Sequence, residues 1–136
     1  MLVAYLSTDE ANPTLAAELA RQEGIGLRHL EPRDGLPGAE FDAVLCDWDY
    51  WHVPGRAGLL ADLSGGAARR PVALHGYHVE PDQVEALRRG GVVLHPRLQA
   101  KVFRQLRQAV LAARVAAACG RDRGDVPGAG GADGAV

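Results

Sequence analysis

The sequence is poor in the features of membrane, secreted and disulfide-stabilised proteins. It has 2 cysteines, too few for a disulfide framework. It also lacks a run of about eighteen apolar residues, the length that a membrane-spanning helix needs. No basic segment precedes Asp9 and Glu10, so we expect no signal peptide. Cys46 stands in an apolar run, which is typical of a reduced core thiol. These absences predict a cytoplasmic protein without a membrane partner.

Basic charge is also too scarce for a typical nucleic-acid-binding domain. The chain has 15 basic and 17 acidic residues and a net charge of −2. The first 50 residues carry ten acids and three bases, whereas the rest carry seven acids and twelve bases. Nucleic-acid-binding domains usually have a clearly basic balance, so we expect no nucleic-acid partner. The basic residues near the C-terminus indicate a solvated helix face, with nucleic-acid contact as the alternative.

What the sequence does have is the size and apolar content of one globular domain. Its 136 residues, 47% of them hydrophobic, are enough to bury a core without a metal or disulfides. We predict a single domain over residues 1–119. Residues 120–136 are rich in glycine and alanine and have no aromatics, so we predict a disordered tail there.

Apolar runs of strand length alternate with helix-like patterns along the chain. The predicted strands are Leu2–Leu6, Ile25–Leu30, Ala43–Cys46, Pro71–Leu74 and Val92–Leu94. This alternation is typical of an α/β protein with an open, doubly wound parallel sheet, here of five strands. In such a sheet all strands end at the same edge, so any chemistry is expected at that edge.

Helix-like patterns fill most of the connections between these strands. Asn12 is expected to cap the first helix, which Gly24 ends. Three further helices are predicted over residues 56–63, 80–89 and 98–119. Residues 32–40 contain too much glycine and proline for a helix, so the second crossover is expected to be irregular.

Four segments, in this order and spacing, resemble the receiver domain of two-component response regulators. Residues 41–47 (Phe-Asp-Ala-Val-Leu-Cys-Asp) resemble the third strand of receivers, and the resemblance places Asp47 at the phosphoacceptor position. Residues 71–77 resemble the fourth strand, residues 86–90 the Ala-Leu-x-x-Gly before the fifth, and residues 94–96 the end of the fifth. The resemblance covers residues 2–118 and implies a flavodoxin-like sheet with strand order 2-1-3-4-5.

The cation site that receivers use is altered in this sequence. Receivers bind Mg²⁺ through an acidic pair after the first strand, and Ser7 and Thr8 stand at that pair here. Asp9 and Glu10 follow one or two residues late. Hydroxyls bind Mg²⁺ more weakly than carboxylates do, and phosphoryl transfer to Asp47 needs a cation. We expect no cofactor, and Mg²⁺ only if the domain is an active receiver.

Two histidines replace further functional side chains of receivers. His75 stands where receivers have their switch threonine, and His95 where they have a lysine that pairs with the phosphoryl group. Together with the altered acidic pair, these replacements make the sequence similar to a degenerate receiver, or pseudo-receiver. We expect a stand-alone regulatory module that binds a protein partner independently of phosphorylation and is not an enzyme.

Two other functions stay open. In one, Asp9 or Glu10 rescues Mg²⁺ binding, and the chain is an active single-domain response regulator phosphorylated on Asp47. In the other, the carboxyl edge of the sheet forms a small metal- or ligand-sensing domain. Imidazoles and carboxylates are good ligands for Zn²⁺. The candidate ligands are Asp47, Asp49, His52, His75, His78 and His95. If the two strand-end histidines are instead pocket residues beside an ionised Asp47, we expect their pKa to rise.

Two surfaces are candidates for partner binding. Trp48, Tyr50 and Trp51 crowd one loop of a chain with only 5% aromatic residues. This cluster indicates either a binding hot spot or packing over the strand ends. The predicted last helix is longer than the sheet needs, so its apolar stripe continues past the sheet. The receiver resemblance implies a homodimer through this helix.

Overall fold

The computed structural model describes residues 1–31, 37–48, 65–67, 69–76 and 79–124. Its strands are β1 (Leu2–Leu6), β2 (Gly26–Leu30), β3 (Ala43–Asp47), β4 (Val72–His75) and β5 (Val93–His95). Its longer helices are α1 (Asn12–Gln22), α3 (Pro81–Arg89) and α4 (Ala100–Gly124). All the predicted strands are present, each with its ends within one residue of the predicted ones. The helix predicted over residues 56–63 lies outside the described residues.

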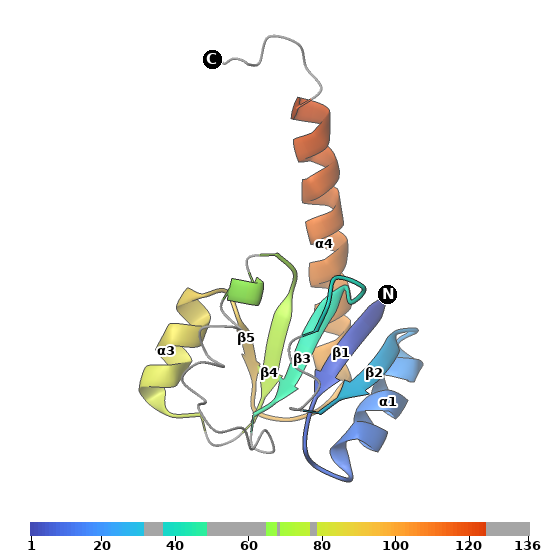
Figure 1. Ribbon diagram of the computed structural model, residues 1–136, viewed down its shortest axis with the longest axis vertical. Coiled ribbons are helices and arrows are strands. Elements are labelled where there is room, and N and C mark those ends of the chain that lie inside the picture. The colour runs from blue at the N-terminus through green and yellow to red at the C-terminus, as the bar shows by residue number, and fades with distance from the viewer. Residues whose placement is uncertain (32–36, 49–64, 68, 77–78, 125–136) are drawn as a thin grey trace.

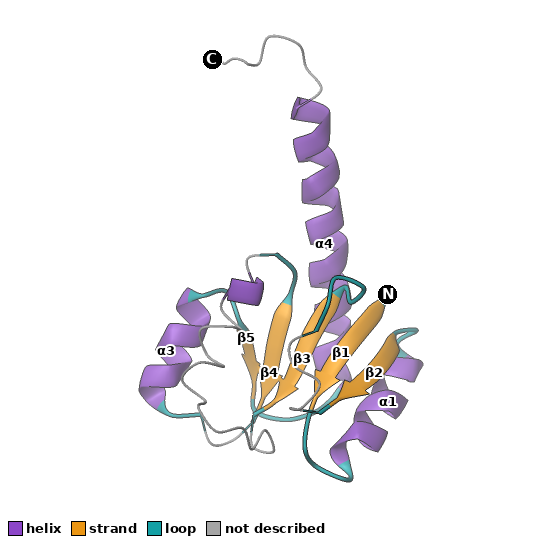
Figure 2. Ribbon diagram, in the orientation of Figure 1, coloured by secondary structure: helices purple, strands orange, loops and turns teal. Residues whose placement is uncertain are grey.

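The strands form one sheet in the order β2-β1-β3-β4-β5, and every neighbouring pair is parallel. This confirms the predicted doubly wound sheet and its strand order. Figures 1 and 2 show α1 and α3 at opposite ends of the sheet, and α4 running past the sheet and out beyond it. Because the strands are parallel, they all end at one edge, where open α/β sheets bind ligands.

Side chains of the strands alternate between two cores, one on each face of the sheet. On one face, Leu6 and Cys46 pack in the same cluster as Leu87 of α3. On the other face, the strand residues pack with Ala16 of α1 and Phe103 of α4. All residues of β3 are buried. This burial on both faces explains why the central strands are continuous apolar runs in the sequence.

The first helix begins differently from the prediction. Its N-cap is Ala11, so the assignment of Asn12 as the cap is wrong. The carboxylate of Asp9 takes over the capping role, because its Oδ2 accepts hydrogen bonds from the backbone N–H groups of Ala11 at 3.0 Å and Asn12 at 2.6 Å. A carboxylate at this place also complements the positive end of the helix dipole. The Asn12 side chain is thereby released for another contact.

The last helix is longer than the prediction. α4 continues to Gly124 instead of ending at Cys119, so the expectation of a disordered tail is wrong for residues 120–124. Gly120 lowers helix stability by only ~1 kcal/mol relative to alanine, which does not prevent the helix from continuing through it. The rest of the predicted tail, residues 125–136, lies outside the described residues.

The state of Cys46 agrees with the sequence-based expectation. Cys46 is a buried free thiol, and Cys119 is a free thiol on the surface. None of the helices in the described ranges combines the length and the apolar character that crossing a membrane requires.

The connection from β2 to β3 depends on one arginine. Its described part, residues 37–42, contains no helix, in agreement with the prediction of an irregular crossover. The guanidinium of Arg70 donates hydrogen bonds to the carbonyl oxygens of Pro37 at 2.6 Å, Phe41 at 3.2 Å and Gly38. These bonds add to the backbone hydrogen bonds of the segment, which run from the N–H of Phe41 to Gly38 and from the N–H of Asp42 to Leu2.

Replacing Arg70 with alanine is expected to lower the free energy of unfolding by ~1.5–3 kcal/mol, because three carbonyls lose a charged donor. The matched control is Arg69→Ala, since the exposed side chain of Arg69 makes no hydrogen bond or ion pair within the described part of the chain. Urea unfolding followed by circular dichroism measures both variants. Equal losses in the two variants would contradict the role given to Arg70.

Candidate functional site

A row of buried polar side chains lies at the carboxyl edge of the sheet. Asp47 is in register with His75, and His75 with His95. Ser7 directly follows β1, whose last residue is level with the residue before Asp47. The exposed fractions are 0% for Ser7, 1% for Asp47, 4% for His75 and 8% for His95. The fold therefore brings together four of the predicted site residues.

One oxygen of the Asp47 carboxylate accepts three side-chain hydrogen bonds. The donors to Oδ2 are Asn12 Nδ2 at 2.8 Å, Ser7 Oγ at 3.0 Å and the Tyr5 hydroxyl at 3.3 Å. The other oxygen, Oδ1, lies 3.9 Å from Nδ1 of His75. A buried carboxylate needs such partners in place of its lost hydration. The side chains of β1 and α1 supply them.

Tyr5 links Asp47 to His75. Its hydroxyl is 2.7 Å from Nε2 of His75, and the two rings stack with centroids 5.7 Å apart and an interplanar angle of 8°. Burial raises the pKa of Tyr5, and the negative charge of Asp47 raises it further, so the hydroxyl keeps its proton. The arrangement that satisfies both contacts has His75 donating from Nε2 to Tyr5 and Tyr5 donating to Asp47.

Of the two acidic residues after β1, Asp9 is directed to α1. Ser7 Oγ, besides donating to Asp47, accepts a hydrogen bond from the backbone N–H of Asp9 at 3.0 Å. The Asp9 carboxylate caps α1, and Glu10 is exposed. Thr8 Oγ1 is buried and has no hydrogen-bond partner among the described residues. None of these four side chains places a second carboxylate on Asp47.

His95 has a different environment from His75. Its Nε2 is buried without a hydrogen-bond partner among the described residues. Burial lowers the pKa of His95, and the nearby Lys101 and His75 lower it further. The expectation of a raised pKa beside an ionised Asp47 therefore does not hold for His95, because burial, Lys101 and His75 lower the pKa of its ring.

The described residues do not assemble a metal centre. No three histidine, cysteine, aspartate or glutamate side chains in these ranges are placed to hold one ion. Of the predicted ligands, Asp49, His52 and His78 lie outside the described residues. The described ligands Asp47 and His75 bond to Tyr5 instead.

Neither a protein-family model nor a curated protein matches this sequence. Solved structures do match it. A response regulator receiver domain protein from Clostridium thermocellum superposes with a TM-score of 0.66 at 13% identity, over 84% of this chain and 97% of that one. The non-phosphorylated HemR receiver domain from Leptospira biflexa gives 0.62 at 13% identity, over 80% and 93%. A two-component response regulator from Clostridium difficile gives 0.62 at 14% identity, over 82% and 96%. This chain has the receiver fold.

Identity at this level establishes the fold, so the chemistry depends on the residues at the carboxyl edge. In the receiver fold, Asp47 ends the third strand, where the sequence resemblance places the phosphoacceptor. Ser7 and Thr8 follow β1, where the resemblance places the acidic pair. His75 and His95 end β4 and β5. The structure thus places Asp47, His75 and His95 at the ends of three neighbouring strands.

The aromatic loop after β3 is only partly described. Trp48 is fully buried and belongs to the core cluster on the α3 side of the sheet. The prediction that Trp48 binds a partner is therefore wrong, because a partner has no access to its ring. Its burial agrees with the alternative interpretation, in which the aromatic residues pack over the strand ends. Tyr50 and Trp51, the other predicted partner-binding residues, lie outside the described residues.

Two residues of the site were missed by the sequence analysis. Tyr5 belongs to an apolar run, and Asn12 stands at a helix start where asparagine is a common cap. Both instead donate to Asp47. One feature of the sequence could have identified Tyr5. It has the one polar side-chain atom in the run from Leu2 to Leu6, and a buried hydroxyl needs a partner.

Tyr5→Phe removes the hydroxyl that joins Asp47 and His75. We expect the free energy of unfolding to fall by about 1–3 kcal/mol, because two buried polar atoms lose a partner. In an Asp47→Asn background the loss should be smaller, since the bond to the carboxylate is already weakened. Urea unfolding of the four proteins of this cycle measures the coupling. Identical losses in both backgrounds would show that Tyr5 and Asp47 act independently.

Proposed function

We propose that this chain is a degenerate receiver, a signalling module that binds a protein partner without being phosphorylated and catalyses no reaction. The observation that carries the proposal is the Asp47 carboxylate, which is 1% exposed and already accepts three hydrogen bonds at Oδ2. The buried free thiol of Cys46 is in keeping with a reducing compartment, so we place the module in the cytoplasm.

The hydrogen bonds of Asp47 oppose phosphorylation directly. Phosphoryl transfer requires a carboxylate oxygen to approach phosphorus in line with the leaving group. Donors from Ser7, Asn12 and Tyr5 surround Oδ2, and Oδ1 faces His75. Freeing Oδ2 breaks three bonds, each worth ~0.5–1.5 kcal/mol net and more where the donor stays buried without a partner. The cost of breaking these bonds adds to the barrier of any phosphoryl transfer to Asp47.

The residues around Asp47 do not fit Mg²⁺, the ion that the receiver resemblance implies. Mg²⁺ prefers an octahedron of oxygens with carboxylates among them. Asp47 is the one carboxylate in the described row, and Ser7 donates its hydroxyl proton to it. Asn12 presents its amide nitrogen, a hydrogen-bond donor, to Oδ2, and Asp9 accepts the N–H groups of α1. A cation on Oδ2 would have to displace these donors.

Acetyl phosphate in the presence of Mg²⁺ tests this proposal. We expect the intact mass of the protein to stay unchanged, as in an Asp47→Ala variant, because the carboxylate lacks both access and a cation. An active receiver incubated in parallel verifies the phosphodonor. A gain of one phosphoryl group that requires Asp47 would contradict the proposal and would identify the chain as an active response regulator.

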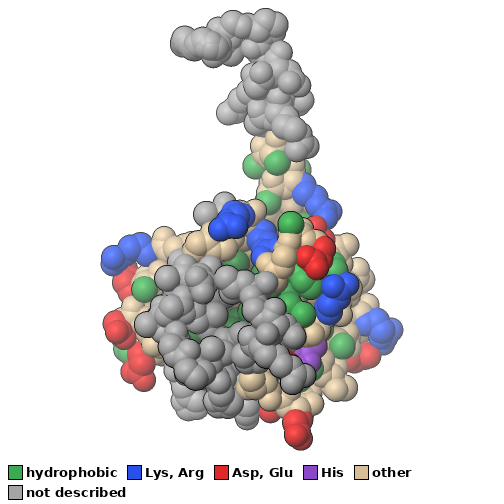
Figure 3. Space-filling view, viewed as in Figure 1, with side chains coloured by type: hydrophobic (Ala, Val, Ile, Leu, Met, Phe, Trp, Pro, Cys, Tyr) green, Lys and Arg blue, Asp and Glu red, His purple; other side chains and the backbone are tan. Residues whose placement is uncertain are grey.

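We infer that a second copy of the chain is one partner, bound through the part of α4 beyond the sheet. Residues 111–119 are all exposed, including Leu111 at 52% and Val115 at 64%. Green hydrophobic side chains are visible on this projecting part in Figure 3. Its one charged residue, Arg114, pairs with Asp42 at 3.1 Å. Two such segments can therefore pack together without like-charge repulsion.

Val115→Lys is expected to abolish this homodimer, because a charge at the centre of the contact loses its hydration. The matched control is Leu15→Lys on α1, where Leu15 is similarly exposed at 46%. Sedimentation equilibrium over a range of protein concentrations measures the effect. We expect a dimer for the wild type and for the control, and a monomer for Val115→Lys. A monomeric wild type would contradict the inference.

A further inference from the structure

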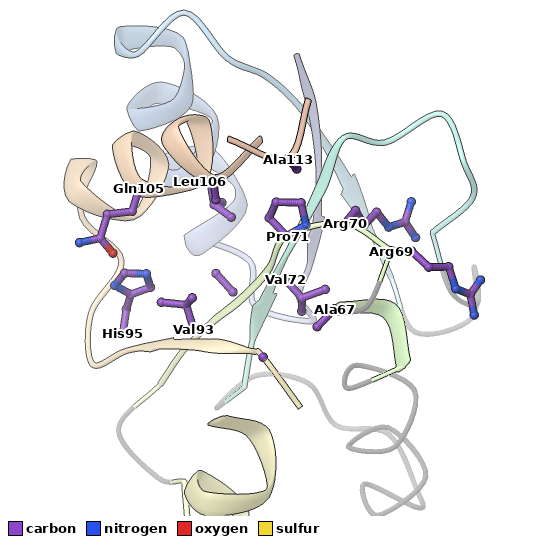
Figure 4. A pocket seen from close by; sticks show the side chains of 13 residues that line it. Ala67, Arg69, Arg70, Pro71, Val72, Val93, His95, Gln105, Leu106 and Ala113 are labelled. Atoms are coloured by element: carbon purple, nitrogen blue, oxygen red, sulfur yellow. The ribbon is translucent and has the colours of Figure 1, made fainter. Parts of the chain in front are cut away.

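A groove of about 290 Å³ lies between α4 and the β4–β5 part of the sheet (Figure 4). Most of its wall is aliphatic: Val72, Ala73, Val93, Leu106, Ala109 and Ala113. Val93 is 48% exposed although it lies in a strand. The volume is close to the lower end of the ~300–1,000 Å³ typical of small-molecule sites. It corresponds to about ten water-sized groups.

One end of the groove is lined by a histidine with an unpartnered ring nitrogen. His95 and Gln105 both line the groove and stand at the same end in Figure 4. His95 is 8% exposed, and its buried Nε2 has no hydrogen-bond partner among the described residues. The lowered pKa of His95 keeps its ring neutral near pH 7. A hydroxyl group satisfies a neutral ring nitrogen in either tautomer, because it both donates and accepts.

The opposite end of the groove presents an arginine. Arg69 and Arg70 line that end in Figure 4. The guanidinium of Arg70 donates to backbone carbonyls, whereas that of Arg69 is exposed and makes no hydrogen bond or ion pair within the described part of the chain. A guanidinium in this state suits a carboxylate, which it binds through two parallel hydrogen bonds.

We propose that this groove binds a small molecule with an apolar body, a hydroxyl group for His95 at one end and a carboxylate for Arg69 at the other. A medium-chain hydroxy acid has this chemistry, and about ten non-hydrogen atoms fill the volume. The apolar body covers Val93, Leu106 and Ala109, whose burial supplies the non-specific part of the affinity.

This inference goes beyond the proposed function and does not depend on it. His95, which lines the groove, ends β5, two strands away from the strand of Asp47. Asp47 itself does not line the groove. His95 is nevertheless in register with His75, which bonds to Tyr5 in the Asp47 network. A ligand on His95 thus binds one strand away from that network. Phosphorylation of Asp47 would refute the proposed function and leave the groove inference standing.

Amide NMR spectra of the full chain, titrated with ω-hydroxyoctanoate, test the proposal. We expect saturable shifts at Val93, His95, Gln105 and Ala109. Octanoate, which lacks the hydroxyl, and octane-α,ω-diol, which lacks the carboxylate, should each bind more weakly. Shifts confined to other parts of the molecule, no saturable shift at millimolar concentrations, or equal affinity for all three probes would overturn the proposal.

Two variants assign the two ends of the ligand. Arg69→Gln is expected to lower the affinity for ω-hydroxyoctanoate by roughly three- to tenfold and to leave the affinity for the diol unchanged. Arg88→Gln, at an exposed arginine on α3, is the matched control and should change neither of the two affinities. His95→Leu should remove the preference for ω-hydroxyoctanoate over octanoate. If Arg69→Gln and Arg88→Gln behave alike, or if His95→Leu keeps the preference, the proposed contacts are wrong.

Discussion

The desolvated carboxylate of Asp47 is the constraint on which the carboxyl edge of this sheet depends. Removing a carboxylate from water costs several kcal/mol unless protein donors replace its hydration. Ser7 and Tyr5 from β1 and Asn12 from α1 are those donors. Asp9 caps α1 and so holds Asn12 within reach. These donors occupy the lone pairs of Oδ2, whereas Oδ1 lies 3.9 Å from Nδ1 of His75.

The fold could be predicted because burial on both faces leaves a strong pattern in the sequence. β3 is buried throughout, and its apolar run is visible without a structure. The glycines and prolines before it likewise predict a crossover without a regular helix. Helix ends were less predictable: α1 is capped by Asp9 in place of Asn12, and α4 continues past Gly120. Where a helix ends depends on single hydrogen bonds and on differences of about 1 kcal/mol in helix stability between residue types.

Only those site residues whose positions follow from the ends of the strands could be predicted from the sequence. That Asp47, His75 and His95 line up at one edge follows from parallel register. The partners of Asp47 depend on tertiary geometry, because the Tyr5 hydroxyl reaches it only from the neighbouring strand β1. The groove beside His95 depends on how α4 crosses the sheet, which no local pattern encodes.

The side-chain amide of Asn12 gives the most direct test of the central claim, since it donates to Oδ2 of Asp47. Its two N–H resonances can be followed by NMR during a titration with Mg²⁺. Our account predicts that they stay where they are at millimolar Mg²⁺, because the amide remains on Asp47. A saturable Mg²⁺-dependent shift of these resonances that Asp47→Ala abolishes would show that the ion displaces Asn12, and would contradict the account.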